Sequence, residues 1–150
     1  MTTVNRLSGY IFDSLLELED GAAPITASGQ GSGIIDLGDA HVTGEIVLDV
    51  SAIDTVTGDE LYDVLVELSD SATFASGVEQ AASIQLGGTT GAAGARDVTS
   101  DAGRYAVPFQ NQLNTRQYRY VRLNLVIGGT STSITFVGYI SKTKASVGAN

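Results

Sequence analysis

Side chains able to carry acid–base, nucleophilic or metal chemistry are few in this chain of 150 residues. It has one histidine, His41, and no cysteine, which excludes disulfides, thiolate metal sites and a cysteine nucleophile. A histidine relay or metal site generally needs a second organised partner, and Asp39, two residues earlier, is weak support for one. We therefore expect His41 to lie in a loop or at a strand end, outside any catalytic site.

The acidic segment 54–60 has the composition of a calcium-binding loop but not its spacing. The third ligand position holds Val56, and no glutamate sits at the distance of the bidentate ligand. A turn with solvated carboxylates is the better interpretation, and calcium at another acidic loop stays open.

Two pairs of carboxylates, Glu45 with Asp49 and Asp63 with Glu67, each share one face of an expected strand. Glycoside hydrolases work with paired carboxylates, which are brought together in space. Because the chain has no tryptophan, it is poorly supplied with rings on which a sugar would stack. We interpret both pairs as solvated outer faces of strands.

The glycine-rich segments 29–33 and 87–91 suggest nucleotide binding only at first sight. A phosphate-binding loop needs a lysine and a hydroxyl side chain that open a helix, and a dinucleotide fingerprint needs a βαβ unit. Neither context is present in the sequence, so we predict that both segments are loops.

Segment 115–127 is the most informative part of the chain. Its alternation assigns one face to the core, namely Val121, Leu123, Leu125 and Ile127. The other face carries Tyr118, Tyr120, Arg122 and Asn124. Tyrosine and arginine are enriched in protein interfaces, so the candidate partner contacts are Arg116, Tyr118, Arg119, Tyr120 and Arg122. The alternative is an ordinary solvated strand whose arginine stems lie over tyrosine rings.

The elements around these residues are predicted to be strands. Alternation with period two indicates strands at 44–50, 62–68, 83–86, 104–109, 118–127 and 133–141, with shorter candidates at 24–27 and 34–36. Residues 10–19 could form one short helix ending at Gly21, and residues 128–131 are predicted to turn a hairpin. About eight strands without a long helix predict an all-β protein, an antiparallel sandwich or barrel.

The length and net charge of the chain restrict the possible domain organisation and partners. A chain of 150 residues predicts a single domain, and its net charge of −9 disfavours general binding to nucleic acid. Residues 1–90 hold fifteen acidic residues and one basic residue, whereas residues 91–150 hold two and seven. This split suggests a charged partner, unless the folded sheets interleave the segments and dilute it. No secretory leader or membrane span is visible, so we expect synthesis in a cytoplasm and no membrane partner.

Four stretches, 12–18, 34–38, 64–70 and 115–140, occur in the order and total length typical of one phage family. The chain resembles the jelly-roll capsid cement (decoration) proteins of tailed double-stranded DNA bacteriophages. The resemblance implies a β-jelly roll on the outer capsid surface that straps neighbouring major capsid proteins together. It implies no catalytic residue, cofactor or metal, and it transfers no contact residues to this chain.

The predicted function is therefore a non-enzymatic structural protein on the exterior of a virion, made in the host cytoplasm. Its predicted partners are the major capsid protein and neighbouring copies of itself, as a dimer or trimer. Residues 1–9 are a candidate flexible arm of the single domain 1–150. The alternatives are a structural protein of the tail or baseplate, or a carbohydrate-binding β-sandwich module.

Overall fold

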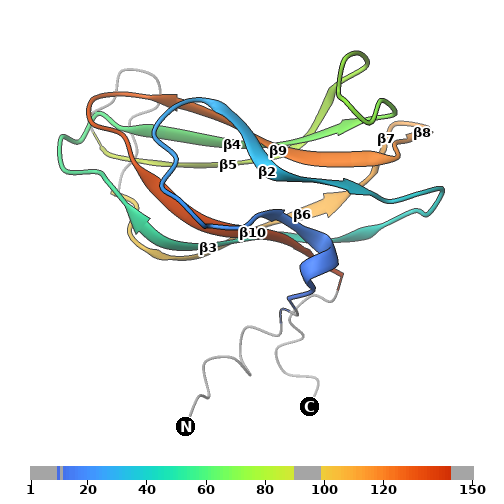
Figure 1. The fold of residues 1–150 in the computed structure, drawn as a ribbon, viewed down its shortest axis with the longest axis horizontal. Helices are drawn as coiled ribbons and strands as arrows, with labels where there is room; N and C mark the ends of the chain where they lie inside the picture. The colour runs from blue at the N-terminus through green and yellow to red at the C-terminus, as the bar shows by residue number, and fades with distance from the viewer. Residues whose placement is uncertain (1–9, 11, 90–98, 143–150) are drawn as a thin grey trace, which may run out of the picture.

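The computed structural model describes residues 10, 12–89 and 99–142 and shows two antiparallel sheets packed face to face (Figure 1). The candidate arm, residues 1–9, lies outside the described residues. Within them no helix has the length and apolar character needed to cross a membrane.

Eight strands make up the two sheets, which we name A and B. Sheet A has the order β1-β10-β3-β6, with β1 (Glu17–Glu19), β10 (Ile134–Ser141), β3 (Thr43–Ile53) and β6 (Gly103–Gln110). Sheet B has the order β2-β9-β4-β5, with β2 (Gly29–Asp36), β9 (Tyr120–Gly128), β4 (Leu61–Ser69) and β5 (Glu79–Gly87). A separate small pair is formed by β7 (Gln112–Leu113) and β8 (Arg116–Gln117).

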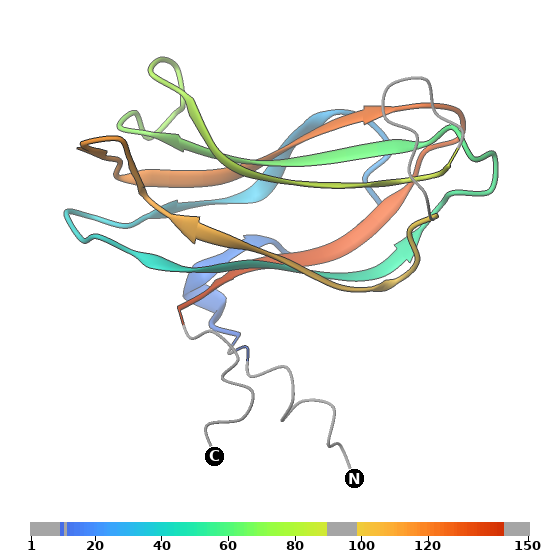
Figure 2. The ribbon, with the colours of Figure 1, turned by 180° about the vertical axis from the view of Figure 1, so that it is seen from behind.

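This strand order is that of a jelly roll. Among the eight strands, the chain crosses from one sheet to the other at every connection except the one from β4 to β5. The crossings within the described residues lie at the two ends of the sandwich, as the view from behind also shows (Figure 2). The predicted all-β jelly roll of about eight strands is confirmed.

The core lies between the sheets and follows the alternation of the sequence. Strand β4 buries every second side chain, and β9 does the same over most of its length. The completely buried members from these two strands are Tyr62, Val64, Val66, Leu68, Val121 and Leu123. Strand β3 contributes Ile46, Leu48 and Val50 from the opposite sheet. Burial of these apolar side chains is the main favourable term in the stability of the sandwich.

The prediction of a loop at residues 29–33 is wrong, because they form the first part of β2. This part of β2 lies against β1. A Cβ atom on Gly31 would lie 2.7 Å from the carbonyl oxygen of Leu18, and one on Gly33 would lie 2.7 Å from that of Glu17. Glycine therefore lets β1 approach β2 closely and close this side of the sandwich.

The short helix expected at residues 10–19 is reduced to one 3-10 turn, η1 (Ser14–Leu16). Asp13 caps it, since its carboxylate accepts a hydrogen bond from the Leu15 amide at 3.0 Å. The next three residues pair with β10 as strand β1, and this edge pairing overrides the helical pattern.

The predicted hairpin at residues 128–131 is also wrong. The turn joins β9 in sheet B to β10 in sheet A, so it crosses between the sheets. Alternation looks the same on both sides of a hairpin and of a crossing, which is why the sequence did not distinguish them. Residues 24–27 contribute only an isolated bridge between Ile25 and Ile134.

Candidate interaction surface

The five candidate contact residues lie along β8, β9 and the bend between them. In the structure Tyr118 faces the interior and Arg122 is enclosed by partners on the outer face of sheet B, while the other three lie at one end of the sandwich. This end also carries the β2–β3 and β4–β5 connections and the β7–β8 pair (Figure 1).

Tyr118 belongs to the core and not to the outer face, so its predicted orientation is wrong. Its residue is 7% exposed and packs with the core side chains. The expected strand 118–127 begins only at Tyr120, because the chain bends at Arg119 and breaks the alternation. The Arg116 guanidinium lies 5.0 Å from the centre of the Tyr118 ring, as the alternative interpretation anticipated.

Asn111 holds this bend in place, and the sequence analysis missed it. Its side chain is fully buried; the Oδ1 atom accepts a hydrogen bond from Val42 at 2.8 Å. Its Nδ2 atom donates to the carbonyl oxygens of Ala40 and Tyr118, both at 2.9 Å. The Asn111 side chain thus joins its own segment to the β2–β3 connection and to the bend at Tyr118. No pattern in the sequence predicts this role.

Arg122 is occupied within the chain. Its guanidinium donates to the Glu67 carboxylate at 2.8 Å and to the Gln30 side chain at 2.9 Å. It also lies 4.3 Å from the centre of the Phe74 ring, which belongs to the β4–β5 connection. Side-chain exposure is 17% for Arg122 and 12% for Glu67. Arg122 therefore fastens a loop to the outer face of sheet B and presents little surface to a partner.

Two exposed arginines, each with a paired aspartate, and one tyrosine lie together at this end of the sandwich. We call this group the Arg–Asp patch; it consists of Asp36, Asp70, Arg116, Arg119 and Tyr120. Arg116 pairs with Asp70 at 2.6 Å and Arg119 with Asp36 at 2.8 Å. The amide of Arg119 also donates to Asp70 at 3.2 Å, and its guanidinium lies 5.4 Å from the centre of the Tyr120 ring. The patch therefore ties β2, the β4–β5 connection and β8–β9 together.

These ion pairs set the protonation of the patch. Hydrogen bonds from Arg119, and then from the Gly38 amide, lower the pKa of Asp36 from 3.8 to about 2. The hydrogen bond from Arg116 lowers the pKa of Asp70. In return, Asp36 raises the pKa of Arg119 and Asp70 raises that of Arg116. All four groups are ionised at neutral pH.

Folding brings basic residues of the second segment beside acidic residues of the first. The four arginines between residues 99 and 142 each pair with a carboxylate from the first ninety residues, as Arg104–Asp49, Arg116–Asp70, Arg119–Asp36 and Arg122–Glu67. Antiparallel pairing of β9 with β2 and β4, and of β6 with β3, brings the two segments side by side. This agrees with the interleaving interpretation of the charge split.

The other chemistry-bearing residues are dispersed. His41 is exposed in the β2–β3 connection. In segment 54–60 the Glu60 side chain is buried and accepts hydrogen bonds from the amides of Thr57 and Gly58, so it is not solvated as expected. Among the described residues, no three histidine, aspartate or glutamate side chains gather where they could hold a metal ion.

The Arg–Asp patch is suited to contact with a protein surface. Its exposed arginines and the half-buried Tyr120 provide contact area and directional hydrogen bonding. Because each charge already has a partner, a second protein can cover the patch without leaving a lone charge buried. Comparisons with protein-family models and with curated proteins find no match for this chain.

Proposed function

We propose that this protein is a non-enzymatic cement protein on the outside of a phage head, where it clamps neighbouring major capsid proteins. The observation that carries the proposal is the jelly-roll strand order in a chain whose segments resemble that capsid family. The Arg–Asp patch supplies its docking surface. A cement protein binds its neighbours over a broad contact area and not in a pocket. A rigid sandwich with a polar surface whose charges are already paired suits such contacts.

Many copies on a closed shell would convert a modest affinity per contact into firm clamping. A protein that binds the assembled shell, and not its separated subunits, stabilises the shell by mass action. Both arguments apply to a dimer or trimer of this chain as well as to a monomer.

The test uses heads of the encoding phage, prepared with and without the protein. We expect the protein to sediment with heads and to raise the temperature at which they release DNA. Equal heat stability of the two preparations, together with no co-sedimentation, would show that the protein is not a cement. Gold labelling of tails, or binding to a glycan array, would then favour a tail protein or a carbohydrate-binding module.

Variants test the docking surface separately. We expect the double variant Arg116→Ala/Arg119→Ala to weaken head binding about tenfold or more, because a tyrosine- and arginine-rich contact loses its anchors. Arg104→Ala removes an ion pair on sheet A and serves as the matched control, with binding retained. Binding should also weaken as salt rises, since the rim charges are exposed. If the double variant bound heads as tightly as the Arg104→Ala control, the Arg–Asp patch would be excluded as the contact surface.

A further inference from the structure

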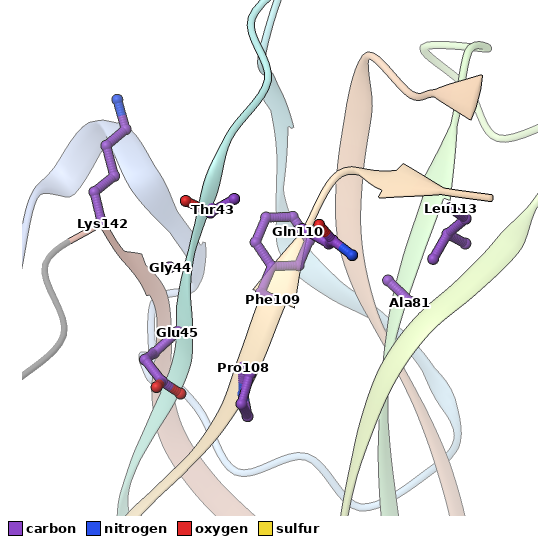
Figure 3. Close-up of a pocket in the computed structure, with 9 residues that line it drawn as sticks. All are labelled: Thr43, Gly44, Glu45, Ala81, Pro108, Phe109, Gln110, Leu113 and Lys142. Carbon is purple, nitrogen blue, oxygen red and sulfur yellow. The ribbon is translucent and has the colours of Figure 1, made fainter. Parts of the chain in front are cut away.

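A groove of about 550 Å³ opens beside β6, and it is lined by residues of β3, β5, β6 and β7 and by Lys142 (Figure 3). Successive side chains of a strand point to opposite faces of its sheet. Glu45 and Pro108 are paired on the outer face of sheet A, whereas Phe109 packs with the core. The side chains that line the groove therefore do not converge on one ligand.

A chemically reactive position lies in the main chain itself, where Asp20 is followed by Gly21 directly after β1. It is the single Asp-Gly sequence among the 150 residues. The backbone nitrogen that follows an aspartate can attack the carboxyl group of that aspartate and close a succinimide ring. Glycine hinders this attack least, because it has no Cβ atom and restricts the backbone least.

The fold requires glycine at position 21. Gly21 has a φ of 65°, in the left-handed region that glycine adopts without strain. A Cβ atom on Gly21 would lie 3.0 Å from the carbonyl oxygen of Phe136 and 3.1 Å from the side chain of Val137. The packing of this turn against β10 therefore disfavours every residue whose side chain would shield the Asp20 carboxyl group.

The contacts of the turn present both reacting groups. Asp20 is exposed, and its Oδ1 atom accepts a hydrogen bond from the Ala22 amide at 2.9 Å, which folds the carboxyl group back along the residues that follow. The Gly21 nitrogen donates to Oε1 of Glu19 at 3.3 Å. Because Glu19 is only 5% exposed, its carboxylate is a proton acceptor held beside the attacking nitrogen and shielded from water.

We propose that Asp20 and Gly21 form a site of spontaneous backbone isomerisation in the folded protein. The Gly21 nitrogen passes its proton to Glu19 and bonds to Cγ of Asp20, while the Cγ–hydroxyl bond breaks. The hydroxyl group takes up that proton and leaves as one water molecule.

Hydrolysis of the succinimide returns the water molecule. Cleavage of the new bond between Cγ and nitrogen restores aspartate, whereas cleavage of the bond between the Asp20 main-chain carbonyl and nitrogen gives isoaspartate. The chain of the isoaspartate form continues through Cγ. No cofactor or second protein takes part, and the proposal goes beyond the cement role without resting on it.

Isoaspartate at position 20 would loosen the attachment of β1, because it lengthens the main chain by one carbon atom next to this strand. The same turn ties β1 to β2. The Asp20 amide donates to Oγ of Ser32 at 2.9 Å, and Oε2 of Glu19 accepts from the Ser32 amide at 2.8 Å. Since β1 has only three residues, displacement of these groups should lower the stability of the protein.

The experiment ages the purified full-length protein for several weeks at neutral pH. Peptides from a protease digest are then separated by chromatography, and electron-transfer fragmentation distinguishes isoaspartate from aspartate. We expect isoaspartate at position 20 to exceed that at Asp101 about tenfold or more, because Asp101 is also exposed but precedes Ala102. Absence of isoaspartate at position 20 in the aged protein would overturn the proposal.

Two variants test the mechanism and its consequence. Asp20→Asn should form the same ring faster, with loss of ammonia, and yield a mixture of aspartate and isoaspartate at position 20. Asp20→Glu keeps a carboxylate but would have to close a larger ring, so it should not isomerise. The aged parent should have a lower Tm than fresh protein, and aged Asp20→Glu should keep its Tm. Equal losses of Tm in the parent and in Asp20→Glu would contradict the proposal without bearing on head binding.

Discussion

At the scale of single residues, the four arginines in the described part of the chain all pair with carboxylates but differ in how deeply they are buried. Arg122 lies between a carboxylate and an aromatic ring and is mostly buried, whereas Arg116 makes a comparable ion pair with a side chain 63% exposed. Exposed pairs contribute little to stability because water and salt screen them, while removal of one member of a buried pair leaves an uncompensated charge.

Replacement of Arg122 by alanine should therefore lower the free energy of unfolding by about 2 kcal/mol, through loss of the contacts with Glu67 and Phe74. Arg116→Ala should change it by less than about 0.5 kcal/mol, since that pair is exposed. Urea denaturation followed by circular dichroism measures both values. Similar losses in the two variants would contradict the difference in burial.

The acid limb of the stability profile should respond to Asp36. Its pKa in the folded protein is about 2, below the ordinary value of 3.8. A lowered pKa stabilises the fold above pH 4, and this contribution disappears as the pH falls from about 4 to 2. Carboxyl NMR titration should find the low value in the parent protein and a value closer to 3.8 in Arg119→Gln. An unchanged pKa in this variant would show that Arg119 is not its cause.

For the candidate contact residues, the residue types could be predicted from the sequence, but their partners and their burial could not. Residue types identified tyrosines and arginines of segment 115–127, but their partners Asp36, Glu67 and Asp70 come from distant strands. Alternation also placed Tyr118 outside, because a single bend before Tyr120 is invisible in the pattern. Burial of an individual side chain depends on such bends and on which strands become neighbours.

At the scale of elements, strands whose apolar and polar side chains alternate could be predicted from the sequence. The glycine-rich part of β2 could not. Strands β3, β4, β5, β6 and β10 contain nearly all of the segments predicted from period two. Glycine has no side chain that could show the period, so residues 29–33 carried no strand signal. Their composition instead reflects the close approach of β1.

Two glycines of β2 allow a matched test of this closure. Gly31→Ala should lower the free energy of unfolding by about 1–3 kcal/mol, because its Cβ would lie 2.7 Å from a backbone oxygen of β1. Gly29→Ala places its Cβ where no atom lies within 4 Å, so its effect should stay within about 0.5 kcal/mol. Chemical denaturation distinguishes the two. Equal stabilities would mean that β1 can move away without loss.

At the scale of the whole molecule, the fold class followed from strand count and the absence of helical periodicity, but the order of strands did not. Period two determines which residues face the core and leaves open which strands are neighbours. The jelly roll pairs strands that lie far apart in the chain, and only β4 and β5 are consecutive partners within the two sheets. That topology sets the cost of closing long loops during folding.

Refolding should accordingly be slow for a protein of this size, with time constants of roughly milliseconds to seconds at 25 °C. Stopped-flow measurement of tyrosine fluorescence is suitable, since the chain has six tyrosines and no tryptophan. Relaxation within microseconds would contradict the expectation drawn from the strand order.

The neighbouring positions of the first and last strands have a mechanical consequence. β1 and β10 run antiparallel at the edge of sheet A, with Glu17 opposite Tyr139, so the beginning of one lies near the end of the other. Tension between these two points would break the hydrogen bonds of the pair one after another, as a zipper opens. Tension along the strands, from one end of the sandwich to the other, would load many hydrogen bonds at once. The sandwich therefore resists force better when it is pulled along its strands than when it is pulled apart at the start of β1 and the end of β10.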